Sequence, residues 1–213
     1  KIKECDYILH FAWTRKSKDN SVNLNFIDLL MKNKKKDSSF YFISSVAASP
    51  KAISTYGKQK YEAYKLVLNN GEKSIILGSV ISPISNQIKI LLKIINLSPF
   101  SIRFSYNFFK TYNIEPESFN KKLLYIIEND IPNKSIVMFD RVLKINDLLK
   151  FLENKYEIKR KYKFIIPVFL IKFIIYIIQK SRLKFSLIDK ILTFTYKDDE
   201  WLNDIQNENK KNL

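Results

Sequence analysis

Short apolar runs alternate with amphipathic segments along the first 83 residues. Three of these runs are rich in β-forming residues and have the length of buried strands: CDYILHFA (5–12), SSFYFISSV (38–46) and KSIILGSVI (73–81). Two intervening segments space their apolar residues as helices do: NSVNLNFIDLLMKNKKK (20–36) and TYGKQKYEAYKLVLNN (55–70). This order of strands and helices predicts an α/β fold in which helices cover a parallel sheet, with ligands at the carboxyl ends of the strands.

The pattern changes after Pro83. Two further helices are expected within residues 88–100 and 111–130, then a strand in KSIVMFD (134–140) and a helix in INDLLKFLENK (145–155). We therefore expect a sheet domain of residues 1–83, to which 135–155 return. Residues 84–134 and 156–205 are expected to form a smaller, mostly helical C-terminal lobe that binds the substrate, and 206–213 a disordered tail.

The most apolar stretch is FIIPVFLIKFIIYIIQKSRL (164–183). It has about fifteen apolar residues, interrupted by Pro167 and Lys172, and a membrane span needs about twenty. We therefore predict no transmembrane span but a buried helix with Pro167 in its first turn. A helix lying on a membrane surface is the alternative, so peripheral membrane contact stays open.

The formal net charge of +16 comes from short basic runs that are scattered along the chain, at 34–36, 121–122, 159–163 and 210–211. Such scatter is not typical of a nucleic-acid-binding protein, and we predict no nucleic-acid partner. An acidic small substrate accounts for part of the charge. The single cysteine, Cys5, excludes an intrachain disulfide and favours a reducing, cytoplasmic location. The chain opens almost directly into a strand without an initiator Met, so we expect the protein to begin elsewhere.

A Tyr-x-x-x-Lys spacing at Tyr56 and Lys60 is the main candidate for chemistry. The same spacing recurs at Tyr61/Lys65 and at Tyr106/Lys110. Only the first pair follows a strand that ends in serine. A serine hydroxyl there could hold the reacting oxygen, and Ser45 is the preferred candidate for this role and Ser44 the less favoured one. Free tyrosine has a pKa near 10, but a lysine one helical turn away favours the phenolate. The pair could therefore act as a general acid/base on a hydroxyl while a hydride passes to a cofactor.

Five segments, in order, carry a resemblance to a known family: DYILHFAW, NSVNLNFIDLL, FISS with YGKQKYEAY, LGSVISP, and KINDLLKFL. Over about residues 1–155 the chain resembles the extended short-chain dehydrogenases/reductases, in the branch of nucleotide-sugar epimerases and dehydratases. The resemblance implies an incomplete Rossmann-like parallel sheet, NAD or NADP as the cofactor, and a nucleotide-sugar substrate. It also leaves a homodimer open, and it implies no metal site.

The resemblance also implies roles for individual residues. Tyr56 would be the acid/base, Lys60 would bind the nicotinamide ribose, and Ser45 would hold the substrate oxygen. The cofactor would further contact Phe11, Ala12, Arg15 and Asn23. Arg15 could equally be a surface charge. We expect His10 to be a packing residue, and Trp13 to be a core or pocket-wall aromatic.

One departure from the family concerns the dinucleotide. The family's Gly-rich turn, which cradles a pyrophosphate at a helix N-terminus, is missing, because the three glycines of this chain do not form it. Two functions therefore stay open. The chain could be most of an NAD(P)-dependent epimerase, dehydratase or reductase in surface polysaccharide synthesis. Alternatively, it could be a truncated or split, inactive remnant that binds no dinucleotide on its own.

Overall fold

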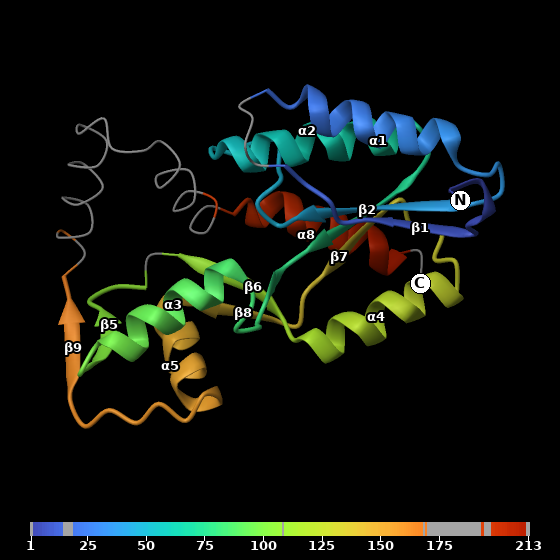
Figure 1. Ribbon diagram of the computed structural model, residues 1–213. Coiled ribbons are helices and arrows are strands. Elements are labelled where there is room, and N and C mark those ends of the chain that lie inside the picture. Colours follow the sequence, from blue (N-terminus) through green and yellow to red (C-terminus); the bar gives the residue numbers. More distant parts are fainter. Residues whose placement is uncertain are drawn as a thin grey trace.

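The computed structural model describes residues 2–14, 19–107, 109–167, 169, 193 and 197–211 (Figure 1). Its elements follow the chain in this order: η1 (Ile2–Glu4), β1 (Tyr7–His10), α1 (Ser21–Asn33), β2 (Ser39–Ser45), α2 (Thr55–Asn69), β3 (Lys73–Leu77), β4 (Ser79–Val80), α3 (Asn86–Leu97), β5 (Ser101–Phe104), β6 (Lys110–Ile114), α4 (Pro116–Glu128), β7 (Ser135–Met138), β8 (Arg141–Lys144), α5 (Ile145–Lys155), β9 (Lys163–Ile166) and α8 (Asp199–Lys211).

The main sheet has the strand order β1-β2-β3-β7, and all its pairs are parallel. Tyr7 lies opposite Ser39 and His10 opposite Phe42, which confirms the predicted parallel pairing of the first two strands. β7 joins β3 on the far side, so a strand predicted from the second half of the chain does return to the sheet. The predicted α/β fold with a parallel sheet is confirmed.

Helices cover both faces of this sheet. Alternate residues of a strand point to opposite faces, so Phe40 and Phe42 pack with α1 and α2, whereas Tyr41 and Ile43 pack toward α4. All four side chains are buried, and a strand buried on both faces explains why the run FYFIS has no polar alternation. α8 adds Leu202 and Ile205 to the α1 and α2 side of the core (Figure 1).

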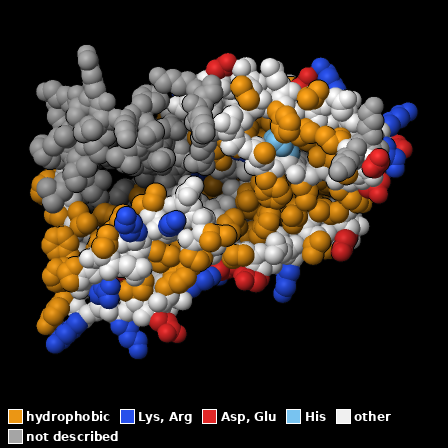
Figure 2. Space-filling model, in the orientation of Figure 1, with side chains coloured by type: hydrophobic (Ala, Val, Ile, Leu, Met, Phe, Trp, Pro, Cys, Tyr) orange, Lys and Arg blue, Asp and Glu red, His pale blue; other side chains and the backbone are white. Residues whose placement is uncertain are grey.

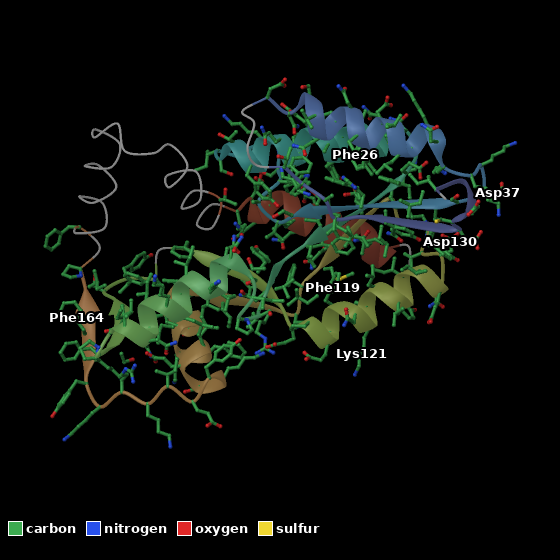
Figure 3. The ribbon with its side chains drawn as sticks, viewed as in Figure 1. Phe26, Asp37, Phe119, Lys121, Asp130 and Phe164 are labelled. Carbon is green, nitrogen blue, oxygen red and sulfur yellow. The ribbon has the colours of Figure 1, made fainter. Side chains whose placement is uncertain are left out.

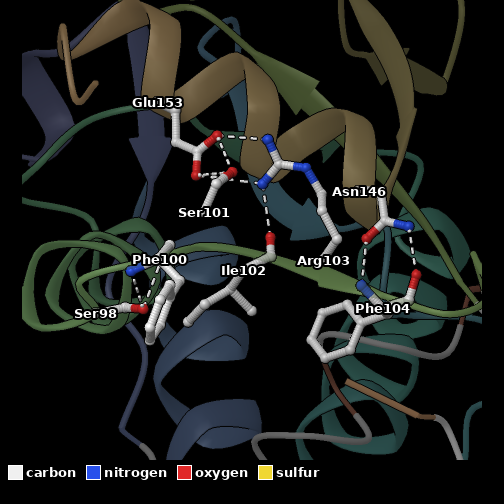
Figure 4. A network of polar contacts seen from close by, with 8 residues as sticks. All are labelled: Ser98, Phe100, Ser101, Ile102, Arg103, Phe104, Asn146 and Glu153. Carbon is white, nitrogen blue, oxygen red and sulfur yellow. Dashed lines mark hydrogen bonds and ion pairs between the residues drawn. The ribbon is translucent and has the colours of Figure 1, made fainter. Parts of the chain in front are cut away.

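A smaller lobe lies beside the sheet. Its described part contains strands as well as helices: the strands β4-β6-β8, the parallel pair β5-β9, and the helices α3 and α5. The apolar stripes of α3 and α5 pack on each other through Ile88, Leu92, Leu148 and Leu152. β5 is fastened to α5 by Arg103 and Glu153 (Figure 4).

Several segments lie elsewhere than the sequence predicts. α4, from the expected lobe, packs on the sheet through Leu123 and Ile126, whereas α5, expected at the sheet, packs in the lobe. Residues 206–211, expected as part of a disordered tail, belong to α8, which packs beside β7 because its apolar residues complete the core.

The apolar stretch from Phe164 also differs from expectation. Lys163–Ile166 form strand β9, which pairs with β5, instead of opening a helix. The rest of the predicted buried helix, and with it the membrane-surface alternative, lies outside the described residues except for Pro167 and Phe169. Within the described ranges, no helix has the length and apolar character needed to cross a membrane.

Candidate active site

The carboxyl ends of β1 and β2 and the start of α2 bring most of the predicted residues to one region. α2 begins where it does because Ser54 caps it, its hydroxyl accepting a hydrogen bond from the Gly57 N–H at 3.0 Å. A side chain at Gly57 would clash, since a Cβ there would lie 2.4 Å from the Ala47 carbonyl oxygen. Glycine therefore lets α2 approach the chain that leaves β2, and it places Tyr56 in the first turn with Lys60 one turn later.

Lys60 is a buried cation with only 3% of its surface exposed. Its ammonium donates to the Ile43 carbonyl at 2.8 Å. It also lies between two aromatic faces, 4.2 Å from the ring centroid of Trp13 and 4.5 Å from that of Phe42. Such cation–π contacts strengthen when water is excluded. The ammonium of Lys60 is thus enclosed by protein groups.

Tyr56 is half-buried beside the same tryptophan. The two rings meet edge to face, with centroids 6.4 Å apart and an interplanar angle of 87°. Trp13 therefore contacts both Tyr56 and Lys60, in agreement with its predicted place as a core or pocket-wall aromatic. The indole Nε1 of Trp13 is buried and has no hydrogen-bond acceptor among the described residues.

The two serines at the end of β2 differ in their surroundings. The Ser45 hydroxyl is half-buried and accepts a hydrogen bond from the Ala47 N–H at 3.2 Å. The Ser44 hydroxyl is buried without a hydrogen-bond partner in the described part of the chain. Strand alternation places Ser44 on the face of Phe42, where Lys60 lies, and Ser45 on the face of Ile43. Ser44, the less favoured candidate from the sequence, is therefore the serine that shares a sheet face with Lys60.

Asn23, predicted to contact the cofactor, is used by the protein itself. Its side-chain oxygen accepts from the Thr14 N–H at 3.0 Å. Its side-chain nitrogen donates to the Thr14 carbonyl and to the Asn20 side chain, both at 3.2 Å. Asn23 therefore fixes the loop that carries Trp13.

The other predicted cofactor contacts are exposed or lie outside the described residues. Ala12 is exposed, and Phe11 is 48% exposed, with its ring edge-on to Phe119. Arg15 lies outside the described residues, so its two alternatives stay open. The sequence reasoning missed Phe42 as a wall of the Lys60 site, although its position two residues before Ser44 on one strand face could have indicated this.

His10 packs among aromatic rings, as predicted. It is 5% exposed, and its ring lies 5.6 Å from Phe26, 6.3 Å from Phe40 and 6.0 Å from Phe42. Burial, and second the positive charge of Lys60, lower the pKa of His10 to about 4. His10 is therefore neutral at physiological pH.

The groups expected to reach the riboses or phosphates of a dinucleotide also hold the protein's own structure together. Lys60 donates to the Ile43 carbonyl, and Asn23 donates to Thr14 and Asn20. No turn with three glycines exists in the sequence to cradle a pyrophosphate. Additional residues or a rearrangement of the loop with Trp13 would be needed to create the site.

Solved structures with the same fold were found, although no protein-family model and no curated protein matches the sequence. One is a nucleoside-diphosphate-sugar epimerase from Staphylococcus aureus (TM-score 0.58, 14% identity, 76% of this chain and 57% of that chain). Another is UDP-glucose 4-epimerase from Thermotoga maritima with UDP-glucose (TM-score 0.54, 17% identity, 76% of this chain and 64% of that chain). A third is WbmG from Bordetella bronchiseptica in complex with NAD and UDP (TM-score 0.56, 10% identity, 76% of this chain and 60% of that chain). This chain thus spans less than two thirds of each of these proteins. At these identities the likeness establishes the fold: the chain has the Rossmann-type fold seen in nucleotide-sugar epimerases.

Proposed function

We propose that this chain carries the acid/base residues of an NAD(P)-dependent epimerase, dehydratase or reductase that acts on a nucleotide-activated sugar in the cytoplasm, in surface polysaccharide synthesis. The observation that carries the proposal is the placement of Tyr56 and Lys60 one turn apart on a capped helix, against one tryptophan, at the carboxyl ends of a parallel sheet. The epimerase fold of the solved structures supports it.

In this proposal the Tyr56 hydroxyl moves the proton of a sugar hydroxyl. Lys60 supplies positive charge one turn away, which favours negative charge on the phenol oxygen during the transfer. A serine at the end of β2, Ser45 or Ser44, orients the sugar oxygen by a hydrogen bond. The nicotinamide, when bound, would supply the hydride chemistry. The residues that hold the dinucleotide would come mainly from outside the described part of the chain.

A second candidate is an inactive remnant that binds no dinucleotide on its own. It is favoured by the enclosure of Lys60 between Trp13 and Phe42 and by its hydrogen bond to Ile43. In this candidate the Tyr56 and Lys60 spacing is structural, since the buried ammonium holds α2 against β2.

The experiment that separates the candidates combines binding and turnover. The purified chain is titrated with NAD⁺ and NADP⁺ in a calorimeter, then incubated with either cofactor and UDP-glucose or UDP-N-acetylglucosamine, with products followed by NMR. If it is an enzyme, Tyr56→Phe should lower turnover by about 10²- to 10⁴-fold. Tyr61→Phe, which removes the hydroxyl of an accidental copy of the motif, should leave turnover nearly unchanged. If the chain neither binds a dinucleotide nor turns over a nucleotide sugar, the result favours the inactive remnant.

A further inference from the structure

The end of the lobe remote from the main sheet is formed by α3, by the strand pair β5 and β9, and by the segment that leads into β9 (Figure 1). The Arg160 guanidinium fastens this segment to the C-terminal end of α3, because it donates to the Ser98 carbonyl at 3.0 Å and to the Asn96 carbonyl at 3.4 Å. Ile102 of β5 lies opposite Phe164 of β9. Elements from two distant parts of the sequence are therefore joined into one surface.

An apolar row lies on this surface. Ile90, Ile94 and Leu97 follow the spacing of one helix face, whereas the buried side chains of α3 lie on the opposite face and pack toward α5. Phe100 follows the helix, and its ring centroid lies 6.1 Å from that of Phe164. Figure 3 shows Phe164 at the end of the molecule remote from the main sheet. The five side chains are 42% to 74% exposed, and apolar side chains grouped on a surface are typical of an interaction site.

Positive charge accompanies the apolar row. Lys89 and Lys93 lie one helical turn apart, in the row of α3 next to it. Neither α3 nor residues 158–166 contain Asp or Glu. Figure 2 shows hydrophobic side chains with Lys and Arg side chains among them over this end of the molecule. We name the apolar row and the exposed lysines of these elements the α3–β9 surface, and its lysines are Lys89, Lys93, Lys159, Lys161 and Lys163.

We propose that the α3–β9 surface docks this chain onto a membrane that contains anionic lipids. The apolar row would enter the boundary between lipid headgroups and acyl chains, and the lysines would remain at the level of the headgroup phosphates. Binding of this kind grows with the apolar area that enters the boundary and with the electrostatic attraction to anionic lipids. Long lysine side chains suit this position, because their stems lie along apolar surface while the ammonium stays in water.

The α3–β9 surface differs from the membrane-surface helix that the sequence leaves open. That helix would begin at Phe164, where the structure has the strand β9. Most of the apolar row belongs instead to α3, and most of the charge comes from α3 and from the basic segment before β9. The proposal therefore needs no residue beyond β9, and it does not depend on the catalytic assignment of Tyr56.

Two other occupants use only part of this surface. In a symmetric pair of this chain, the lysines of one copy would face those of the other, and each copy already carries a formal net charge of +16. Nucleic acid would contact the lysines through its phosphates, but Ile90, Ile94 and Leu97 offer phosphates no partner. An anionic bilayer engages both the apolar row and the cations.

The test is sedimentation of the full chain with vesicles of phosphatidylcholine, either alone or with about 30% phosphatidylglycerol. Binding to the anionic vesicles should be at least about tenfold tighter and should weaken as the salt concentration rises. Lys161→Glu combined with Lys163→Glu should weaken it at least about tenfold, because two attractive charges become repulsive. Leu97→Glu should weaken it by a similar factor of about ten, since a charge then replaces an apolar side chain.

Matched controls carry the same changes elsewhere. Leu29→Glu replaces an exposed leucine of α1, and Lys36→Glu combined with Lys121→Glu alters the net charge as much as the lysine pair does. Both controls should change binding by less than about threefold, since the charges that act on a bilayer lie within about a Debye length of it. Thermal unfolding close to that of the parent chain should show that every variant is folded.

Four outcomes would overturn the proposal. The first is equal binding, or none, with the two kinds of vesicle. The second is equal weakening by the controls, which would indicate attraction by the net charge alone. The third is a dimer in light scattering that Leu97→Glu dissociates, because the occupant would then be a second copy. The fourth is release from the vesicles by duplex DNA together with loss of DNA binding in the Lys161 and Lys163 variant, which would assign the surface to nucleic acid.

Discussion

Two cations in different parts of the molecule, Lys60 in the sheet and Arg103 in the lobe, are both withdrawn from water, but they differ in their partners. The Arg103 guanidinium meets the Glu153 carboxylate at 2.5 and 3.2 Å, and Ser101 donates to the same carboxylate at 2.8 and 3.1 Å (Figure 4). Lys60 instead contacts a backbone carbonyl and the faces of two aromatic rings.

The difference separates a structural ion pair from a candidate functional cation. A guanidinium matched by a carboxylate in bidentate geometry joins β5 to α5, and its charge is neutralised locally. Aromatic faces and a carbonyl stabilise an ammonium without such neutralisation. The positive charge of Lys60 is also the second cause, after burial, that lowers the pKa of His10.

The substitution that we expect to lower the free energy of unfolding most is in the lobe. Glu153→Ala leaves the Arg103 charge with only 17% side-chain exposure and without its carboxylate, which typically costs about 3–5 kcal/mol of unfolding free energy. Urea denaturation of the two proteins measures it. Lys32→Ala, which breaks an exposed pair with Asp28, should cost below about 0.5 kcal/mol. A similarly small loss for Glu153→Ala would contradict the role of the buried pair.

The second-largest expected effect is the dependence of folding stability on pH through His10 in the main sheet. The pKa of His10 is lowered to about 4 in the folded protein, whereas it is near 6.5 in an unfolded chain, which therefore binds more protons between these values. Stability should thus fall as the pH drops from about 6.5 toward 4, by up to about 3 kcal/mol. Urea denaturation at several pH values measures this loss. His10→Gln should flatten this part of the profile, and an identical slope in the variant would assign the loss to other groups.

Removing the charge of Lys60 should have a smaller effect on stability than Glu153→Ala. Lys60→Met keeps the long side chain but loses the bond to the Ile43 carbonyl and the cation–π contacts, for about 1–2 kcal/mol. It should also raise the pKa of His10, because one cause of its lowering is removed. NMR titration of the single histidine measures this shift. An unchanged His10 pKa would mean that burial alone sets its value.

The sequence predicts the sheet better than the lobe, for physical reasons. The runs that became β1, β2, β3 and β7 are local apolar segments that satisfy the strand pattern wherever they lie. The location of α4 and α8 depends on tertiary packing, since only contact with the core shows that Leu123 or Leu202 completes it. Lys163–Ile166 form a strand because β5 offers a partner distant in sequence.

In the candidate site, too, some features follow from the sequence and others depend on tertiary contacts. The positions of Tyr56 and Lys60 on one helix follow from spacing alone, and the structure agrees with them. The enclosure of Lys60 by Trp13 and Phe42 follows from contacts between three elements, which no spacing reveals. The serine that faces Lys60 depends on where β2 ends, and a shift of one residue exchanges the two faces.

The smallest expected effect decides between these serines. Ser44→Ala removes a buried hydroxyl that has no hydrogen-bond partner among the described residues, so stability should be unchanged or rise by up to about 1 kcal/mol. Ser45→Ala loses the hydrogen bond from the Ala47 N–H and should cost about 0.5–1 kcal/mol. Thermal unfolding of both variants beside the parent chain resolves this difference in sign.

If the chain turns over a nucleotide sugar, the serine that orients the substrate is the one whose alanine variant loses activity without a matching loss of stability. Loss of turnover in Ser44→Ala alone would assign the role to the face of Lys60, and loss in Ser45→Ala alone would uphold the assignment made from the resemblance. Equal, small effects of both would mean that neither hydroxyl contacts the reacting oxygen, and β2 would then contribute to the site only through the Ile43 carbonyl that holds Lys60.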